Sequence, residues 1–212
     1  MNRFVPGVCA AGLLALGAAS AFGADSGWYV GTGLGPSKTD INNGSINNEL
    51  AIQSPGQTTT GITQDNKSTM YKLFVGYNVA SFVALEASMF RLGSFSFNAT
   101  TTGGTFNGDI DVWGGSVDVL GIIPLNHWRL FGRVGGLYGQ STVKLGGTGA
   151  VTVPDSNPGE TKFGYKFGAG VGYEFDSGVG FRAEWEYYHT ADGMGDHLNT
   201  NTFSASVLYR FQ

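Results

Sequence analysis

Residues along the segment 165–175 alternate sharply in character. One face of the segment is apolar and aromatic, whereas the other carries only glycine and charge. The first face comprises Tyr165, Phe167, Ala169, Val171, Tyr173 and Phe175, and the second comprises Lys166, Gly168, Gly170, Gly172 and Glu174. A period of two is typical of a β-strand whose two faces meet unlike surroundings. Because this pattern recurs about eight times along the chain, it predicts a membrane barrel with lipid outside and a polar interior.

Eight strands are expected, most of them about nine to fourteen residues long, and a tilted strand needs about 9–11 residues to cross a bilayer. They cover 27–35, 69–78, 82–92, 110–121, 127–140, 162–175, 179–189 and 202–211. Long polar connections (36–68, 93–109, 141–161 and 190–201) alternate with short turns (79–81, 122–126 and 176–178). This order predicts an all-β fold, an eight-stranded antiparallel up-and-down transmembrane β-barrel. Its long loops would face outward, and both termini would lie on the periplasmic side.

The N-terminus reads as an export signal, with Arg3 before the apolar stretch 4–17 and an Ala19-x-Ala21 cleavage pattern. We therefore divide the chain into a signal peptide at 1–21, with cleavage between 21 and 24, and an outer-membrane β-barrel at 22–212. No uncharged apolar run of about 18 residues follows the signal, which excludes a helical membrane anchor. The single cysteine, Cys9, lies inside the signal, so no disulfide is expected. The net charge of −4 argues against a nucleic-acid partner.

Aromatic residues near the strand ends are expected to form belts at the two headgroup levels of the membrane. The periplasmic belt would contain Trp28, Tyr77, Trp128 and Phe211, and the outer belt Trp113, Tyr138 and Tyr165. The expected strand 110–121 fits the alternation least well, because Ile110 and Val112 are out of phase with Trp113. A β-bulge near Trp113 and Gly114 would reconcile them.

Inward positions of the expected strands carry charges of both signs. The ion-pair candidates are Lys72, Glu86, Asp118, Arg133, Lys166, Arg182, Glu184 and Arg210. Buried charges persist only when they are paired or hydrated. Two hypotheses follow, either an ion gate along a narrow water-filled path or a polar core that plugs a barrel too narrow for a channel.

Five short runs, in order, resemble the transmembrane barrel of the outer-membrane protein A family and its smaller relatives. They are Gly27-Trp28-Tyr29-Val30-Gly31, Phe82-Val83-Ala84-Leu85-Glu86, Arg133-Val134-Gly135-Gly136, Phe181-Arg182-Ala183-Glu184 and Val207-Leu208-Tyr209-Arg210-Phe211. The resemblance covers 27–212 and implies lumenal charge partners at Glu86, Arg133, Arg182 and Glu184. Asp118 stands where such barrels often carry a lysine. The terminal aromatic resembles the signal that is read by the barrel assembly machinery.

The expected protein resides in the cell outer membrane of a Gram-negative bacterium, has a structural role in envelope integrity, and allows a narrow porin-like permeability. Its partners would be outer-membrane lipids and lipopolysaccharide, and it would be a monomer. The alternative is a surface adhesin or opacity-type protein that binds a host ligand through loops such as 36–68. A third hypothesis is a lipid-modifying enzyme using His127, His189 and His197. We nevertheless expect no enzyme, no cofactor and no metal, although His189, Asp192, Asp196 and His197 could form a loose metal site.

Overall fold

The computed structural model describes residues 26–40, 43–44, 47, 51, 56, 58–151, 160–191 and 197–211. The predicted signal peptide, and with it Cys9, lies outside these residues, as do Asp192 and Asp196. The strands are β1 (Gly27–Asp40), β2 (Thr59–Asp65), β3 (Lys67–Ala80), β4 (Val83–Thr101), β5 (Gly104–Leu125), β6 (Trp128–Gly149), β7 (Glu160–Glu174), β8 (Val179–Ala191) and β9 (His197–Arg210). None of the helical residues in this part of the chain belongs to a segment long and apolar enough to span a membrane.

The strands form one antiparallel sheet that closes on itself. Each strand of the ring pairs with its neighbour in sequence, and the ring closes where β1 pairs with β9, with Tyr29 opposite Arg210. In the described residues β2 pairs only with β4, and it continues the line of β3 beyond Asn66. The ring therefore contains eight strands. The predicted eight-stranded up-and-down barrel is confirmed.

The strands are longer at the outer end than the sequence predicted. Most of the expected loop 93–109 is strand, because β4 and β5 continue as a hairpin whose turn is Thr102 and Gly103. Much of the expected loop 141–161 likewise belongs to β6 and β7. Residues such as Phe95, Phe97 and Phe106 alternate with polar neighbours, so the period of two continues through a segment whose composition resembles a loop.

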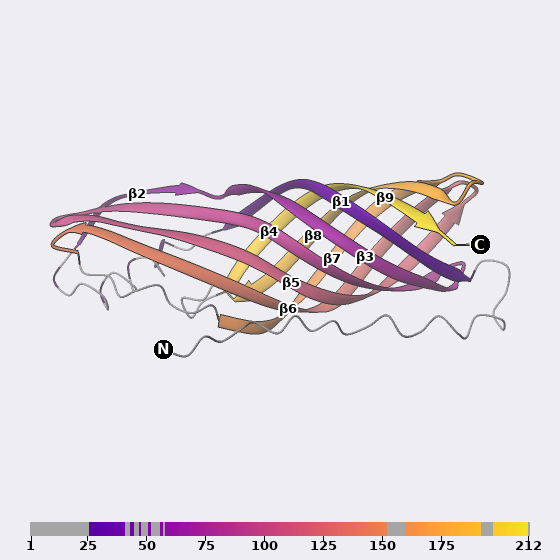
Figure 1. The fold of residues 1–212 in the computed structure, drawn as a ribbon, viewed down its shortest axis with the longest axis horizontal. Coiled ribbons are helices and arrows are strands. Elements are labelled where there is room, and N and C mark those ends of the chain that lie inside the picture. The colour runs from indigo at the N-terminus through magenta and orange to yellow at the C-terminus, as the bar shows by residue number, and fades with distance from the viewer. Residues whose placement is uncertain are drawn as a thin grey trace, which may run out of the picture.

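This added length stands on one side of the barrel. The outer parts of β2, β4, β5 and β6 extend well beyond the ends of the neighbouring strands (Figure 1). We call this four-stranded region, residues 59–65, 95–110 and 142–149, the protruding sheet. On it, Phe97, Ala99 and Phe106 form a small apolar cluster with Val151, and the rings of Phe97 and Phe106 lie 5.6 Å apart.

The expected bulge near Trp113 and Gly114 is wrong, because β5 alternates without interruption. Ile110 and Val112 point inward and are buried, whereas Trp113 points outward. The irregularity instead lies in the neighbouring strand β4, between Arg91 and Gly93. Gly93 has a φ of 108°, a backbone conformation that glycine adopts without strain. The bulge moves the inward positions of β4 from even to odd residue numbers.

The barrel interior is layered rather than polar throughout. A lower apolar cluster comprises Tyr29, Phe74, Ala84, Leu120, Ile122, Phe131 and Leu208, which lie toward the periplasmic ends of their strands. An upper cluster comprises Met70, Phe90, Leu92, Phe95, Ile110, Val112, Leu137, Val143, Tyr188 and Leu198, which lie toward the outer ends. Most of the inward charges lie between these two clusters along the strands, whereas Arg129, Glu174 and Arg210 lie beyond the lower cluster at the periplasmic end. The expectation of a wholly polar interior is thus corrected, because bulky apolar side chains also fill a ring of eight strands.

The outward face is apolar along the strands, and aromatic side chains gather near both ends. At the periplasmic end Trp28 packs on Tyr77, with ring centroids 5.1 Å apart, and Trp128 packs on Tyr173 at 5.0 Å. Phe211 there is half exposed. At the outer end lie Trp113, Tyr138 and Tyr165, each about half exposed to the surroundings of the barrel. That these two groups lie at the headgroup levels of the membrane stays a prediction.

Candidate functional site

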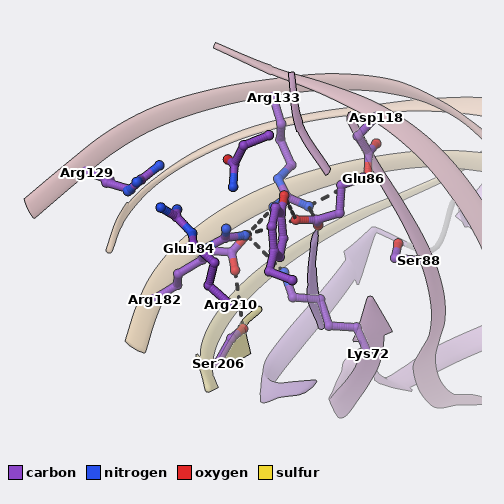
Figure 2. Close-up of polar contacts among 12 residues, drawn as sticks. Lys72, Glu86, Ser88, Asp118, Arg129, Arg133, Arg182, Glu184, Ser206 and Arg210 are labelled. Atoms are coloured by element: carbon purple, nitrogen blue, oxygen red, sulfur yellow. Dashed lines mark hydrogen bonds and ion pairs between the residues drawn. The ribbon is translucent and has the colours of Figure 1, made fainter. Parts of the chain in front are cut away.

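Eight charged side chains meet between the two apolar clusters and form a central network. Six consecutive strands of the ring supply them, because each residue occupies an inward position of its strand. The four cations and four carboxylates balance, and all eight residues are buried. The members are Lys72, Glu86, Asp118, Arg133, Lys166, Arg182, Glu184 and Glu186. Figure 2 labels six of them, all except Lys166 and Glu186, and shows Arg133, Glu86 and Glu184 pointing toward one another inside the barrel.

Arg133 is the centre of this network. Its Nη1 lies 2.9 Å from a Glu86 oxygen and 3.1 Å from a Glu186 oxygen, and its Nη2 lies 2.7 Å from Glu184. A more distant contact of 3.7 Å reaches Asp118. Because a guanidinium presents several N–H groups in fixed directions, one arginine can join carboxylates from three different strands.

The remaining cations link the same carboxylates. The Lys72 ammonium lies 3.0 Å from Glu184 and 2.8 Å from Glu186. The Lys166 ammonium lies 2.9 Å from Asp118 and 3.3 Å from Glu186. Each lysine thus joins two carboxylates, and Glu186 contacts both lysines as well as Arg133. Glu186, an inward charge outside the predicted candidates, is therefore as fully engaged as any of them.

Arg182 connects the network to the lower apolar cluster. It donates a hydrogen bond to Glu86 at 2.9 Å, and its guanidinium lies over the rings of Tyr29, Phe74 and Phe131 at 4.8 to 5.4 Å. Aromatic faces attract a cation, and the attraction is larger where water is excluded. The charged layer and the apolar layer below it are consequently held together by direct contacts.

Neutral hydroxyl groups complete the network, and sequence reasoning missed them. The Tyr29 hydroxyl donates to Glu86 at 3.0 Å, and the Ser206 hydroxyl donates to Glu184 at 3.2 Å. Strand parity could have identified Tyr29, since it lies between the outward residues Trp28 and Val30. Its charge partner could not be inferred, because Glu86 is 57 residues away in sequence.

One predicted candidate lies outside the central network. Arg210 forms a separate cluster near the periplasmic end, where its Nη2 lies 2.8 Å from Glu174 and the Nε of Arg129 lies 3.0 Å from the same carboxylate. These side chains are 14 to 19 % exposed. The periplasmic cluster thus has two cations for one carboxylate and is more open than the central network.

The histidines do not come together in the described part of the chain. His127, at a periplasmic turn, contacts Asp176 at 3.2 Å, whereas His189, at the outer end of β8, contacts Asn199 at 2.7 Å and stacks on Tyr165. His197 begins β9, and its side chain lies outside the described residues. Within the described residues no three His, Cys, Asp or Glu side chains are grouped as metal ligands would be.

The protruding sheet offers a second candidate site on its outward face. A shallow pocket of about 290 Å³ runs across β2, β4 and β5, and polar side chains supply most of its lining. Its residues are Thr63, Gln64, Asp65, Ser96, Phe97, Asn98, Asn107, Gly108 and Asp109. Asn98 stands opposite both Thr63 and Asn107 in the register, so amide and hydroxyl groups lie side by side across three strands.

The closed ring, the apolar outer belt and the paired interior charges define an outer-membrane barrel protein. Residues 8–211 match the family model described as the outer membrane protein beta-barrel domain, and the chain belongs to that family. The protein accordingly resides in the outer membrane. The resemblance to the outer-membrane protein A type of barrel, inferred from the sequence, is confirmed.

Several solved structures are similar to this chain at low sequence identity. Neisserial surface protein A is 13 % identical, with 88 % of this chain and 99 % of that chain covered and a TM-score of 0.57. The attachment invasion locus protein of Yersinia pestis, solved with the heparin analogue sucrose octasulfate, is 14 % identical, with coverages of 87 % and 99 % and a TM-score of 0.47. The N-terminal barrel of OprF from Pseudomonas aeruginosa is 11 % identical, with coverages of 87 % and 98 % and a TM-score of 0.49. No curated protein sequence matches the chain.

Proposed function

We propose that this protein is a surface-recognition protein in which the barrel is a closed anchor and the protruding sheet is the contact surface. The observation that carries the proposal is the one-sided extension of β2, β4, β5 and β6 beyond the ring (Figure 1). Spanning the membrane requires only about 9–11 residues of each tilted strand, whereas β5 and β6 each have 22. The surplus length therefore serves a purpose other than crossing the bilayer.

The packing of the interior argues against the narrow permeability that the sequence also allowed. An ion crossing the barrel would have to pass two apolar clusters and a charged layer whose members already bind one another. An eight-stranded ring encloses a space that side chains can fill. In this proposal the barrel contributes to envelope integrity as a stable anchor. The balanced charges of its interior give it a fixed shape that carries the protruding sheet.

The outward face of the protruding sheet suits a polar partner. Thr63, Ser96, Asn98 and Asn107 offer hydroxyl and amide groups around the shallow pocket. Such groups bind by directed hydrogen bonds, which distinguish partners by geometry rather than by apolar area. Loops predicted from sequence as the adhesive element are thus replaced, in this proposal, by a sheet with a fixed arrangement of side chains.

The test compares adhesion of cells that display the native protein with adhesion of cells displaying a shortened protein. In the shortened form an Asn-Gly turn joins Ser94 to Asp111, which are cross-strand partners, in place of residues 95–110. We expect adhesion to cultured epithelial cells to fall to background. Two double variants distinguish a role of the pocket side chains from a role of the sheet as a whole. Asn98→Ala with Asn107→Ala alters the pocket, whereas the control, Thr105→Ala with Thr148→Ala, alters an exposed pair elsewhere on the sheet. Full adhesion of the shortened form would refute the proposal.

We propose no catalytic step. Acyl-transfer or hydrolytic chemistry needs a nucleophile, a base and an orienting group in one place, and His127 and His189 lie at opposite ends of the barrel. Unchanged lipid A composition in cells carrying combined alanine substitutions of His127, His189 and His197 is the expected result. Altered lipid A would favour the enzyme hypothesis instead.

A further inference from the structure

A shallow groove of about 460 Å³ lies on the outward wall of the barrel, across β5, β6 and β7. Val117, Tyr138 and Phe163 form its sides, and these side chains are 54 to 85 % exposed. Gly115 and Gly136 lie between them, since Gly115 pairs with Tyr138 and Val117 pairs with Gly136. Val117 and Tyr138 thus each stand opposite a glycine, and the missing side chains leave the hollow, which Phe163 borders beside Tyr138.

The groove lies within the membrane, close to its outer surface. Trp113 of the outer belt precedes Gly115 on β5 by two residues and Val117 by four, which is about 13 Å along a strand. The apolar band of such barrels is about 25 Å tall, so the groove occupies its outer half. Polar side chains border it on the outer side, where Arg91, Trp113 and Gln140 are cross-strand neighbours.

We propose that this groove binds one acyl chain of a lipopolysaccharide molecule of the outer leaflet. Apolar side chains and glycine dominate its lining, so hydrocarbon is its favourable occupant. The side chain of Arg91 is 55 % exposed and pairs with Asp111 at 2.7 Å, which places a cation beside the level of the phosphorylated headgroup. The acyl chain would fill the groove, and the headgroup of the same lipid would lie above it at the level of Arg91.

A second copy of the chain fits this groove less well. Stable protein interfaces involve about 20–30 residues on each side, whereas nine residues line the groove. Its aromatic side is also narrow, because the rings of Phe163 and Tyr138 pack against each other at a tilt, with centroids 5.2 Å apart. A single flexible acyl chain can follow a groove of this width, whereas the rigid strands of a second barrel cannot enter it.

The glycines permit a substitution that fills the groove without disturbing the sheet. A Cβ atom added at Gly136 meets no heavy atom within 4 Å, and the same is true at Gly121, which also faces outward on β5 but lies outside the groove. Gly136→Leu therefore blocks the proposed site, and Gly121→Leu is its matched control. Heat-dependent gel mobility establishes that both variants fold as barrels.

The experiment is native mass spectrometry of the full-length protein extracted from outer membranes in mild detergent. We expect the native protein and Gly121→Leu to retain one lipopolysaccharide molecule. Gly136→Leu should retain about tenfold less, the change that corresponds to about two methylene groups losing their burial. Equal retention in Gly136→Leu and the native protein would overturn the proposal. So would a bound phospholipid in place of lipopolysaccharide, or a dimer that only Gly136→Leu abolishes.

Discussion

Arg133 illustrates how much one buried side chain can support. Its guanidinium contacts Glu86, Glu184 and Glu186, and all three of these carboxylates are buried. Removing one member of a buried ion-pair network leaves uncompensated charge, which costs more than the intact network contributes. The whole network is therefore sensitive to single substitutions. Replacing all of its members together by apolar residues, in contrast, need not lower the free energy of unfolding.

We expect Arg133→Ala to lower the free energy of unfolding by about 3–5 kcal/mol, because it leaves four carboxylates facing three cations. Urea unfolding in lipid vesicles, followed by tryptophan fluorescence and gel mobility, measures the change. Arg91→Ala is the control, since Arg91 forms an exposed pair with Asp111 that contributes only about 0–1 kcal/mol. Similar losses for the two variants would contradict the assignment of Arg133 to a dry interior.

Two buried tyrosines give a finer test of the same interior. Tyr29 donates to Glu86, whereas the hydroxyl of Tyr188 has no hydrogen-bond partner among the described residues. Tyr29→Phe should cost about 1.5–3 kcal/mol of unfolding free energy, the range for a bond to a charged group. Tyr188→Phe should be neutral or stabilising, because it removes a buried polar atom that lacks a partner. The same unfolding measurement ranks the two variants, and the reverse order would contradict a hydrogen bond from Tyr29 to Glu86.

At this scale, the alternation of residues along a strand predicts whether a side chain faces inward or outward. It does not predict which side chain from another strand becomes its partner. Inward and outward positions follow from the alternation, which is why seven of the eight charges of the central network were predicted as lumenal candidates. Arg210 was grouped with them because parity says nothing about depth along the barrel. Depth depends on the stagger between strands, and only the paired register supplies it.

Among the elements, β4 shows how one residue changes the use of a strand. Below Gly93 its even-numbered residues face inward, and beyond it the odd-numbered ones do, so that Phe95 and Phe97 point to the inner side. The bulge also pairs Gly93 with Val112 without interrupting β5. It therefore lets a single strand serve first as barrel wall and then as part of the protruding sheet.

Gly93→Ala should destabilise the protein by about 1 kcal/mol or more, because its φ of 108° disfavours any side chain and an added Cβ would meet the side chain of Ser68. Gly121→Ala should have little effect, since space around that position is open. Amide hydrogen exchange of 95–101 reports the local consequence, and faster exchange is expected only for the Gly93 variant. An unchanged exchange rate would mean that the bulge does not hold the protruding sheet in place.

The largest errors in the predicted strand boundaries lie in this region, although β1 and β9 also extend into the expected loops 36–68 and 190–201, and β5 extends through most of the expected turn 122–126. Segments 93–109 and 141–161 are rich in Gly, Thr and Asn, a composition that favours loops. Pairing outweighed composition there, because β4, β5 and β6 stay hydrogen-bonded to one another to their outer ends, as when Ala99 pairs with Phe106. Strand propensity is weak evidence when a neighbouring strand already offers hydrogen bonds.

At the scale of the whole molecule, the layered interior predicts that the barrel does not conduct ions. Planar bilayers containing the refolded barrel should show no discrete conductance steps, and neither Glu86→Ala nor Arg133→Ala should produce them once folding is established by gel mobility. The upper and lower apolar clusters remain intact in both variants. Discrete channels in the native protein, altered in size or open time by Glu86→Ala, would instead identify the network as a gate.

The ring closes between β1 and β9, the first and last strands of the barrel, so the barrel cannot close until the whole chain is present. Thr39 and Thr200, whose hydroxyl groups lie 2.8 Å apart, are separated by 161 residues of chain. Contacts so distant form slowly, since most of the chain must be in place before they can exist. Until then β1 and β9 are open edges, and an edge with unpaired N–H and C=O groups is costly in hydrocarbon. Biogenesis therefore requires a catalyst that shelters both edges at once and releases the polypeptide only when they meet.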